Sequence, residues 1–349
     1  TEADLSQTVG WLTSMFPLRL EVGGLDLDDP QSAGHAVRRI KERLRALPDK
    51  GLGYGILRYL DTGSTLAQAN TLAPQLVFNY LGRLDQKTAN TKQWQLAEGF
   101  ASTAKDAADR QRLHLIEVNA VIHANGALTF EVNYCRQAYS KASMEQLVRC
   151  FETMLKTVSE HCLHSPFANR HTPSDYPLVK QAIDQAPLLT QSLLDQLTLQ
   201  YPDLQDIVPL TPSQQVLAFE SMARQAGLED PYHIQIILIV EGKLDIAAMR
   251  RAWTRVMKRH SILRLILAPA DIAPGLGLIR GEEACDDQVV ELSGTYEQRL
   301  AQIQAMDLEE GFNFEHQPLV RLRIGDLGDG KSALLISKHH LILDGWSLP

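Results

Sequence analysis

The sequence predicts a mixed α/β protein, an α+β arrangement in two layers, with two domains. At 349 residues the chain is longer than one hydrophobic core usually serves, so two domains are expected. Its composition, 44% hydrophobic and 22% charged, is typical of a globular protein. Each half places segments with helical periodicity beside strand-like segments, which is the pattern of helices layered on sheets.

The first half predicts two helices and a hairpin. Apolar residues recur at helical spacing over residues 35–47 and again over residues 144–162, where they form one face of a long helix. Between these segments, two alternating runs flank Asn125-Gly126, the dipeptide best suited to the positive φ angles of a tight turn. A β-hairpin is therefore expected there.

The middle of the chain has a different composition. Five prolines punctuate residues 166–205 and leave only short apolar runs, with one short helix expected near residues 190–199. Such a segment is typical of a linker between domains. The two domains are therefore expected at residues 1–165 and 206–349.

The second half predicts helices and strands in alternation. Thr211 is a suitable cap for a helix whose first turn holds Pro212. The run YHIQIILIV is a strand too apolar to be exposed on both faces, and residues 246–260 form an amphipathic helix. The last strand, SALLISK, leads into His339 and His340.

Charge and composition exclude several classes of function. The net charge of -8 and the pI near 5.8 argue against a nucleic-acid binder, which needs a basic surface. No apolar run is long enough for a membrane helix, and no signal peptide is visible. The four cysteines lack the close spacing of a zinc or redox motif. We expect a cytoplasmic protein with reduced thiols and without nucleic-acid or membrane partners.

The stretch HHLILDGWS holds the strongest candidate site. Neighbouring side chains on an extended backbone point to opposite faces, so one of His339 and His340 can face a cavity while the other packs behind it. A neutral imidazole can take a proton from an attacking amine or hydroxyl. Asp344 is expected to orient the site through a salt bridge, and Gly345 to permit the tight turn that follows.

Two other interpretations of these histidines stay open. Both can be structural residues at the end of a strand. A metal site of His339, His340 and Asp344 is disfavoured, because adjacent histidines on a strand diverge and no further ligand is evident. We therefore expect no bound metal.

Two further stretches admit more than one interpretation. GLGYG, residues 51–55, has the glycines of a phosphate-binding loop, but it follows a helix and no helix is evident at its end, so a bend is expected. A basic cluster is either a solvated helix face or a surface for an anionic partner, such as a phosphopantetheine arm or an acidic carrier protein. The cluster consists of Arg38, Arg39, Lys41, Arg43, Arg45 and Lys50.

Three stretches of the second half together resemble a known family. HHLILDGWS is similar to the His-His-x-x-x-Asp-Gly motif of nonribosomal peptide synthetase condensation domains. LTPSQQVLAFESM at residues 210–222 and RHSILRLIL at residues 259–267 are similar to two other motifs of that family, and they precede it in the expected order. Three ordered motifs are more specific than one.

The first half resembles the C-terminal lobe of an epimerization domain from the same superfamily. LSQTVGWLTSMFPLRL, PDKGLGYGILRYL and FNYLGRLD match its late motifs in order, although Gln7 replaces the usual arginine and Leu12 the usual phenylalanine. TPSDYPLV is similar to the usual connection between such domains. The resemblance implies an epimerization lobe over residues 1–165, a linker over residues 166–205, and the N-terminal lobe of a condensation domain, truncated after its histidine motif, over residues 206–349.

The resemblance also implies a fold and roles for particular residues. The fold would be two chloramphenicol-acetyltransferase-like half-domains joined by the linker. His340 would position an attacking amine or accept its proton during peptide-bond formation, while His339 and Asp344 would be structural. Asn79 and Tyr80 would line the substrate tunnel of the epimerization lobe. An epimerization domain directly upstream implies a condensation domain that accepts a D-configured donor.

The implied substrates are thioesters on the 4′-phosphopantetheine arms of upstream and downstream peptidyl carrier domains, with no cofactor bound directly. An adenylation domain and the missing complementary lobes are the other implied partners in this secondary-metabolite or antibiotic biosynthesis, and the isolated chain is expected to be inactive. Two alternatives stay open. One is a free-standing acyltransferase that uses coenzyme A, which would place the histidine motif early in the chain. The other is a non-catalytic scaffold that binds carrier domains.

Overall fold

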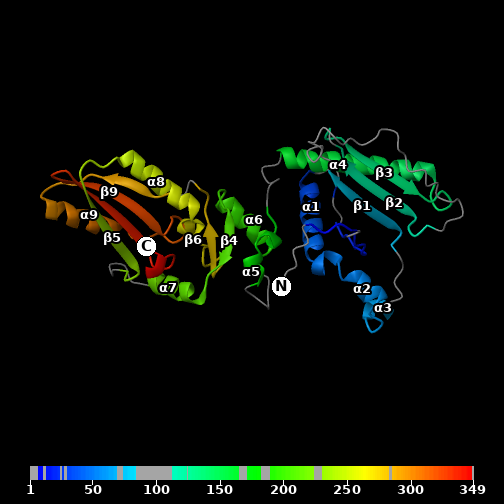
Figure 1. The fold of residues 1–349 in the computed structure, drawn as a ribbon, viewed down its shortest axis with the longest axis horizontal. Helices are drawn as coiled ribbons and strands as arrows, with labels where there is room; N and C mark the ends of the chain where they lie inside the picture. Colours follow the sequence, from blue (N-terminus) through cyan, green and yellow to red (C-terminus); the bar gives the residue numbers. More distant parts are fainter. Residues whose placement is uncertain are drawn as a thin grey trace. The chain divides into compact units, whose positions relative to one another are not determined.

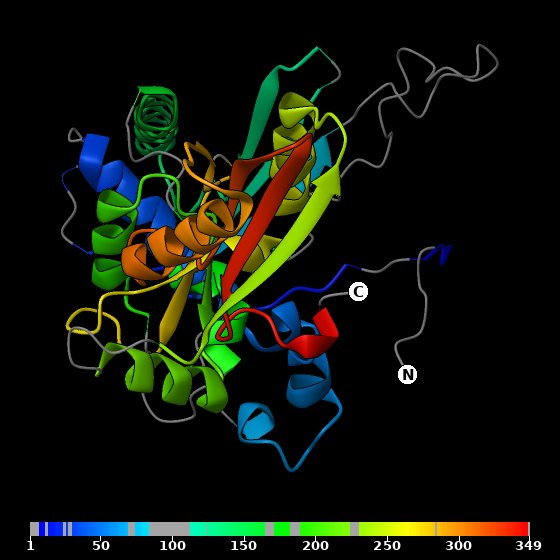
Figure 2. The same ribbon diagram turned by 90° about the vertical axis from the view of Figure 1, so that its left-hand side faces the viewer.

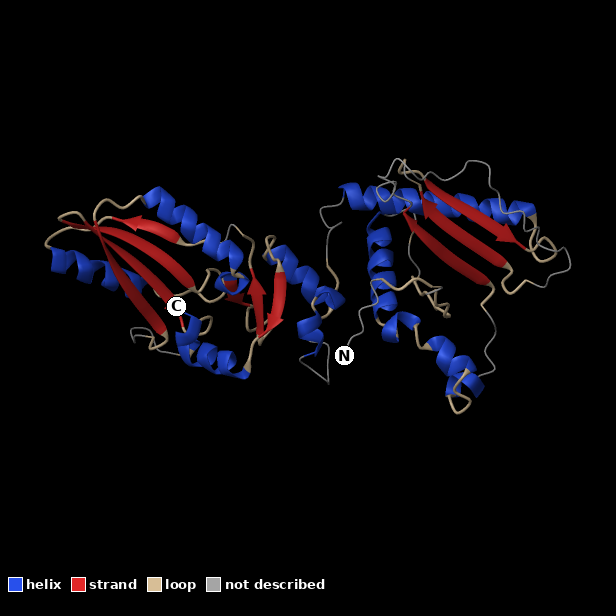
Figure 3. Ribbon diagram, in the orientation of Figure 1, coloured by secondary structure: helices blue, strands red, loops and turns tan. Residues whose placement is uncertain are grey.

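The computed structural model describes residues 7–10, 13–23, 26, 30–68, 74–83, 112–123, 125–164, 171–181, 189–223, 230–282 and 285–347. The chain divides into two compact units, Thr1–Ala168 and Asn169–Pro349 (Figure 1). Both units combine helices with strands, which confirms the mixed α/β class (Figure 3). None of the helices in the described ranges has the length and apolar character that a bilayer span requires.

The first unit is a three-stranded sheet with helices. Its elements are α1 (Pro30–Arg45), α2 (Tyr54–Tyr59), α3 (Thr65–Gln68), β1 (Leu76–Arg83), β2 (Ile116–Ile122), β3 (Leu128–Tyr134) and α4 (Lys141–His164). The strand order is β1-β2-β3, with β1 parallel and β3 antiparallel to β2. The two helices predicted from periodicity are α1 and α4, so that prediction is confirmed.

The core of the first unit lies between its sheet and α4. Alternate residues of β2, Ile116 and Val118, are buried together with Met144 of α4. The Phe130 ring on β3 meets the Phe151 ring on α4 edge-on, with centroids 4.5 Å apart. Apolar residues at every second position of β2 and at helical spacing on α4 thus form one shared apolar layer.

The predicted hairpin is present, with a loop longer than a two-residue turn. The His123 N–H donates to the Ala127 carbonyl at 2.8 Å, and the Gly126 N–H donates to the His123 carbonyl at 2.9 Å. Gly126 has a φ of +82°, whereas Asn125 is not among the described residues with positive φ. Glycine is therefore required at one position of this loop rather than at both.

The GLGYG stretch is a bend, as expected. Gly51 has a φ of +83°, and a Cβ placed there would lie 2.2 Å from the Phe16 ring, so only glycine fits. One part of the expectation was wrong, because a helix, α2, does begin within the stretch at Tyr54.

The second unit contains two sheets. Its elements are α5 (Pro177–Gln181), α6 (Gln191–Gln200), β4 (Asp206–Pro209), α7 (Pro212–Met222), β5 (His233–Glu241), α8 (Ile246–Arg259), β6 (Leu265–Leu267), β7 (Leu276–Ile279), β8 (Asp287–Val290), α9 (Tyr296–Glu310), β9 (Val320–Gly328) and β10 (Lys331–His339). The sheet orders are β5-β10-β9-β8 and β4-β7-β6. Strand β10 is antiparallel to both of its neighbours.

Successive side chains of β10 point to opposite faces of the larger sheet, and each face packs against a different helix. Leu335 packs in one cluster with Ile303 of α9, whereas Leu334 packs in another with Met249 and Trp253 of α8. Figures 1 and 2 show both helices beside this sheet. The sheet is therefore covered by α9 on one face and by α8 on the other.

Helix α7 begins with the Thr211 cap that the sequence predicts, and its first turn is bonded to the turn after β10. The Thr211 hydroxyl accepts from the Gln214 N–H, the Gln214 side chain accepts from the Thr211 N–H, and Pro212 stands in the first turn. The Gln214 side chain also donates to the Leu341 carbonyl at 3.1 Å. This bond ties α7 to the turn that follows β10.

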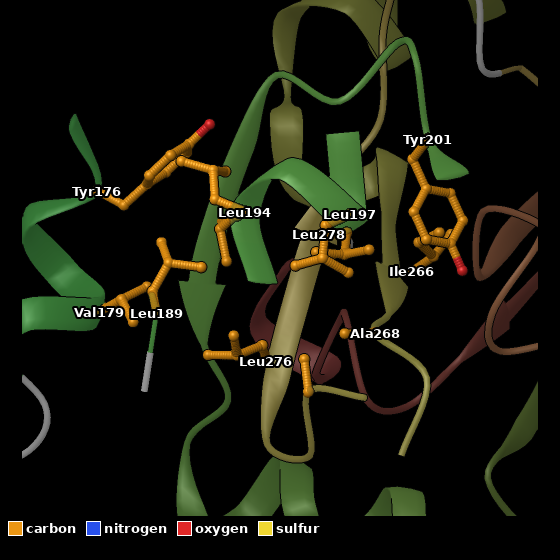
Figure 4. Close-up of a cluster of buried hydrophobic side chains, with 12 residues drawn as sticks. Tyr176, Val179, Leu189, Leu194, Leu197, Tyr201, Ile266, Ala268, Leu276 and Leu278 are labelled. Carbon is orange, nitrogen blue, oxygen red and sulfur yellow. The ribbon is translucent and has the colours of Figure 1, made fainter. Parts of the chain in front are cut away.

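The described part of the proline-rich interval, for which a linker with one short helix is expected, packs within the second unit. Tyr176, Val179, Leu189, Leu194, Leu197 and Tyr201 are buried in one cluster with the apolar side chains of β4, β6 and β7 (Figure 4). The short helix predicted there is α6, capped by Thr190. These residues form part of the core of the second unit.

The strand predicted at residues 232–240 is present as β5, at the edge of the four-stranded sheet. Ile237 packs partly buried in the cluster with α9, and Val240 in the cluster with α8, whereas Leu238 is 50% exposed and Ile239 39%.

Candidate active site

His339 and His340 lie at the end of β10, one of the two inner strands of the larger sheet. The last pair of the β5–β10 ladder joins His339 to His233. His339 is fully buried, and His340, the first residue of the following turn, is exposed. The prediction that the two side chains diverge is therefore confirmed.

The His339 ring is held by three hydrogen bonds. Its Nδ1 accepts from the Leu341 backbone N–H at 3.1 Å, so the ring proton is on Nε2. Nε2 lies 3.2 Å from Asp230 Oδ2 and 3.1 Å from Ser221 Oγ. Burial lowers the pKa of His339 below its ordinary value, against the opposing effect of Asp230. A neutral and enclosed imidazole of this kind is suited to holding the turn.

The segment that holds His339 also holds His340. Asp230 Oδ1 accepts from the Tyr232 N–H at 3.0 Å, while the Tyr232 carbonyl accepts from the His340 N–H at 2.8 Å. Burial alone would raise the pKa of Asp230, but hydrogen bonds from Tyr232, Ser221 and His339 outweigh it and lower that pKa. Residues 230–232 thus fix the backbone of one histidine and the side chain of the other.

His340 presents one ring nitrogen to solvent. Its Nδ1 lies 2.9 Å from the Leu343 carbonyl oxygen. A carbonyl only accepts hydrogen bonds, so Nδ1 carries a proton, and the neutral ring then has its lone pair on Nε2. The exposed side chain can therefore accept a proton or a hydrogen bond at Nε2.

Asp344 and Gly345 differ from their predicted roles. The Asp344 carboxylate accepts from the Ser347 N–H at 3.1 Å and from the Ser347 hydroxyl at 2.7 Å, rather than forming the expected salt bridge within the described residues. The hydroxyl of Ser347 is the main cause that lowers the pKa of Asp344. Gly345 does not have a positive φ, and a Cβ there would meet nothing within 4 Å, so the structure does not explain a need for glycine.

Asn79 and Tyr80 lie on β1 in the first unit. Both are exposed, Tyr80 by 53% of its surface. The Asn79 amide donates to Asn119 Oδ1 at 3.2 Å across the β1–β2 pair. Both side chains are therefore accessible to a ligand that binds the first unit.

Sequence reasoning missed the partners that build the site. Ser221, Asp230 and Tyr232 precede the histidines by more than 100 positions. Ser221 lies within the motif at residues 210–222 but was not singled out, and Asp230 and Tyr232 lie outside the three motifs of the second half. Lys338, one residue before the pair, was also missed. In the ranges that the structure describes, no group of three or more histidine, cysteine or acidic side chains is arranged to hold a metal.

The buried state of His339 predicts a pH dependence of stability. Because folding holds its pKa below the unfolded value of about 6.5, its contribution is complete above about pH 6.5 and is lost as the pH falls through the lowered pKa. We expect urea unfolding to show this decrease between about pH 7.5 and about pH 5.5. His339→Gln keeps a donor for Asp230 and should show a smaller decrease. An equal decrease in both proteins would contradict the assignment.

Comparison with known proteins identifies several relatives of this chain. It is 33% identical over 354 residues to a component of the linear gramicidin synthase of Brevibacillus parabrevis, and 31% identical over 356 residues to a component of the mycosubtilin synthase of Bacillus subtilis. These matches cover 99% and 100% of this chain but only 4% and 13% of those proteins. The crystal structure of the starter condensation domain of rhizomide synthetase matches with 18% identity and a TM-score of 0.35, over 41% of this chain and 34% of that one. That score is too low to support an argument.

One family model matches most of the chain. It is described as the condensation domain, and it matches residues 1–175 and 204–349. The second match contains the histidine pair and each of its hydrogen-bond partners described above. The chain therefore belongs to the condensation-domain family, which includes catalytic domains of nonribosomal peptide synthetases.

Proposed function

We propose that this chain is part of a nonribosomal peptide synthetase, in which residues 206–349 supply the histidine lobe of a condensation domain that joins two carrier-bound thioesters. The observation that carries the proposal is the state of His340, whose Nδ1 is held by the Leu343 carbonyl while Nε2 is left to accept. Family membership and relatives that belong to peptide synthases support the setting.

In the proposed reaction the amine of the downstream aminoacyl thioester attacks the carbonyl carbon of the upstream thioester. His340 Nε2 holds the amine in line or accepts its proton as the C–N bond forms. The C–S bond then breaks, and the proton is returned to the departing phosphopantetheine thiolate. The Leu343 carbonyl holds the imidazole and the Tyr232 carbonyl holds the backbone of His340, while Asp230 binds both Tyr232 and His339.

The finer assignments rest on the motifs. Residues 1–165 would be the second lobe of an epimerization domain with Asn79 and Tyr80 in its tunnel, and both halves would be chloramphenicol-acetyltransferase-like. The condensation domain would then accept a D-configured donor. Carrier domains on either side, an adenylation domain and the complementary lobes would complete the assembly. The exposed positions of Asn79 and Tyr80 on β1 are compatible with this role.

Replacement of His340 tests the main proposal. In a synthetase that contains this chain together with complementary lobes and carrier domains, His340→Ala should lower the rate of peptide-bond formation by about 10²–10⁴-fold, the usual range for loss of an acid–base group. Mass spectrometry of the product on the downstream carrier would measure the rate.

His316→Ala is the matched control, because His316 is an exposed histidine of the same unit, remote in sequence from the motif. It should leave the rate unchanged. Product formation at the same rate in His340→Ala and in wild type would exclude His340 from the chemistry.

A further inference from the structure

Lys338 is a buried lysine two residues before the exposed histidine. It is 1% exposed. Its ammonium donates to two backbone carbonyls, those of Leu343 at 3.3 Å and Asp344 at 3.2 Å. The side chain therefore connects the end of β10 to the turn that follows it.

Burial of this charge is unfavourable in itself. It lowers the pKa of Lys338 below its ordinary value, with only Asp344 acting in the opposite direction. A methionine has a similar volume and would pack there without the cost of desolvating an ammonium ion. The favourable contacts of the ammonium are its hydrogen bonds to the two carbonyls, which offset this cost.

One of these carbonyls is also the partner of His340. Leu343 O accepts from His340 Nδ1 at 2.9 Å and from Lys338 Nζ at 3.3 Å, which uses both lone pairs of the oxygen. The second bond of the ammonium, to the Asp344 carbonyl, fixes the next peptide group. Lys338 thus holds the acceptor that decides which nitrogen of the His340 ring carries the proton.

The remaining support of His340 acts on its backbone. Its N–H is bound by the Tyr232 carbonyl, and this bond does not select a ring tautomer. Without a fixed carbonyl at Leu343, the ring is free to rotate and to carry its proton on either nitrogen. Only the tautomer with the proton on Nδ1 leaves Nε2 able to accept.

We propose that Lys338 is a positioning residue for His340: its buried ammonium holds the Leu343 carbonyl so that His340 keeps its proton on Nδ1 and offers Nε2 to the substrate amine. The catalytic part of this inference rests on the proposed function, whereas the part about the tautomer does not.

The first experiment measures the tautomer directly in the 349-residue chain. With ¹⁵N-labelled histidine, the Nδ1 and Nε2 shifts of His340, assigned by comparison with His340→Gln, should show a protonated Nδ1. In Lys338→Met the two shifts should move toward each other as both tautomers become populated. Lys331→Met, the same change at the other end of β10, should leave them unchanged. Unchanged His340 shifts in a folded Lys338→Met protein would overturn the proposal.

The second experiment measures turnover in the complete synthetase. Lys338→Met should lower kcat for peptide-bond formation by about 10–100-fold, the effect expected of a misplaced catalytic group, with KM within about twofold of wild type. Lys338→Arg keeps a cation with several donors and should restore part of the rate. A kcat equal to that of wild type in Lys338→Met would overturn the catalytic part.

Two further results keep the proposals separate. If Lys338→Met does not fold, Lys338→Gln, which also lacks the charge, takes its place in both experiments. If His340→Ala makes product as fast as wild type, the proposed function fails, and the nitrogen shifts still decide whether Lys338 sets the state of the ring.

Discussion

Asp307→Asn should lower the free energy of unfolding of the second unit by about 3–5 kcal/mol, the usual cost of breaking a buried ion pair. Asp307 lies on α9 and is 1% exposed, and its carboxylate accepts hydrogen bonds from four side chains of the described residues. Arg321 Nε is 2.6 Å from Oδ1, while His233 Nε2, Gln235 Nε2 and the Ser337 hydroxyl bind Oδ2. An amide would set its own N–H groups against these donors and leave the Arg321 guanidinium with only its longer ion pair to Glu310, at 3.6 Å, among the described residues.

The same carboxylate predicts how the loss depends on pH. Burial alone would raise the pKa of Asp307, but hydrogen bonds from His233, Ser337, Gln235 and Arg321 outweigh it and hold that pKa well below its usual range. A lowered pKa gives stability that is complete above the unfolded value of about 3.9 and is lost as the pH falls through the folded value. Wild type and Asp307→Asn should therefore differ most near neutral pH and approach each other in acid.

Urea unfolding at about pH 7 and about pH 3 would measure both effects. Asp326→Asn is the control, because its side chain is 80% exposed and lies 3.8 Å from Arg299; it should change stability by less than about 0.5 kcal/mol. Equal losses in the two variants would contradict the importance of the buried network. Arg321→Met in the Asp307→Asn background should recover part of the loss, since it removes a buried charge whose remaining acidic partner is Glu310, at 3.6 Å.

This buried network also supports the candidate site. The Arg321 guanidinium lies 4.5 Å from the centre of the Phe312 ring, and Phe312 in turn packs edge-on against His339, with centroids 6.2 Å apart. Loss of the Asp307 carboxylate should therefore disturb the aromatic side chains that enclose His339 as well as the stability of the unit.

Local patterns predicted local structure well. The Thr211 cap, the glycine turn at Gly126 and the divergence of His339 from His340 each depend on a few neighbouring residues, and each is present. The partners of the two histidines were not predictable in this way. Asp230 and its neighbours reach the site only because β5 pairs with β10, and no spacing in the sequence encodes that pairing.

The proline-rich interval contains helical elements as well as turns. Its prolines predict a linker, and Pro177 stands at the first position of α5 while Pro173 opens a short 3-10 turn, where proline is favoured. The prolines therefore begin elements as well as interrupt them. Leu194 and Leu197, spaced for one helix face, were the signal that indicated a packed segment.

Leu197→Ala should lower the free energy of unfolding of the second unit by about 2–5 kcal/mol, the range for removing a buried leucine side chain. Leu197 is 0% exposed and lies in the cluster that joins α6 to Ile207, Ile266 and Leu278 of the smaller sheet. If the interval were only a linker, the substitution would cost little, because a flexible segment has no cavity to leave behind.

Leu199→Ala on the same helix is the matched control, since Leu199 is 69% exposed. It should change stability by less than about 0.5 kcal/mol in the same urea or thermal unfolding measurement. Equal effects of the two substitutions would mean that α6 does not pack on the sheet. A large difference would place α6, which lies in the interval between the two family matches, within the folded unit that presents His340. The unit that folds would then begin before residue 204, where the second family match starts, because the sheet needs α6 to cover its apolar side chains.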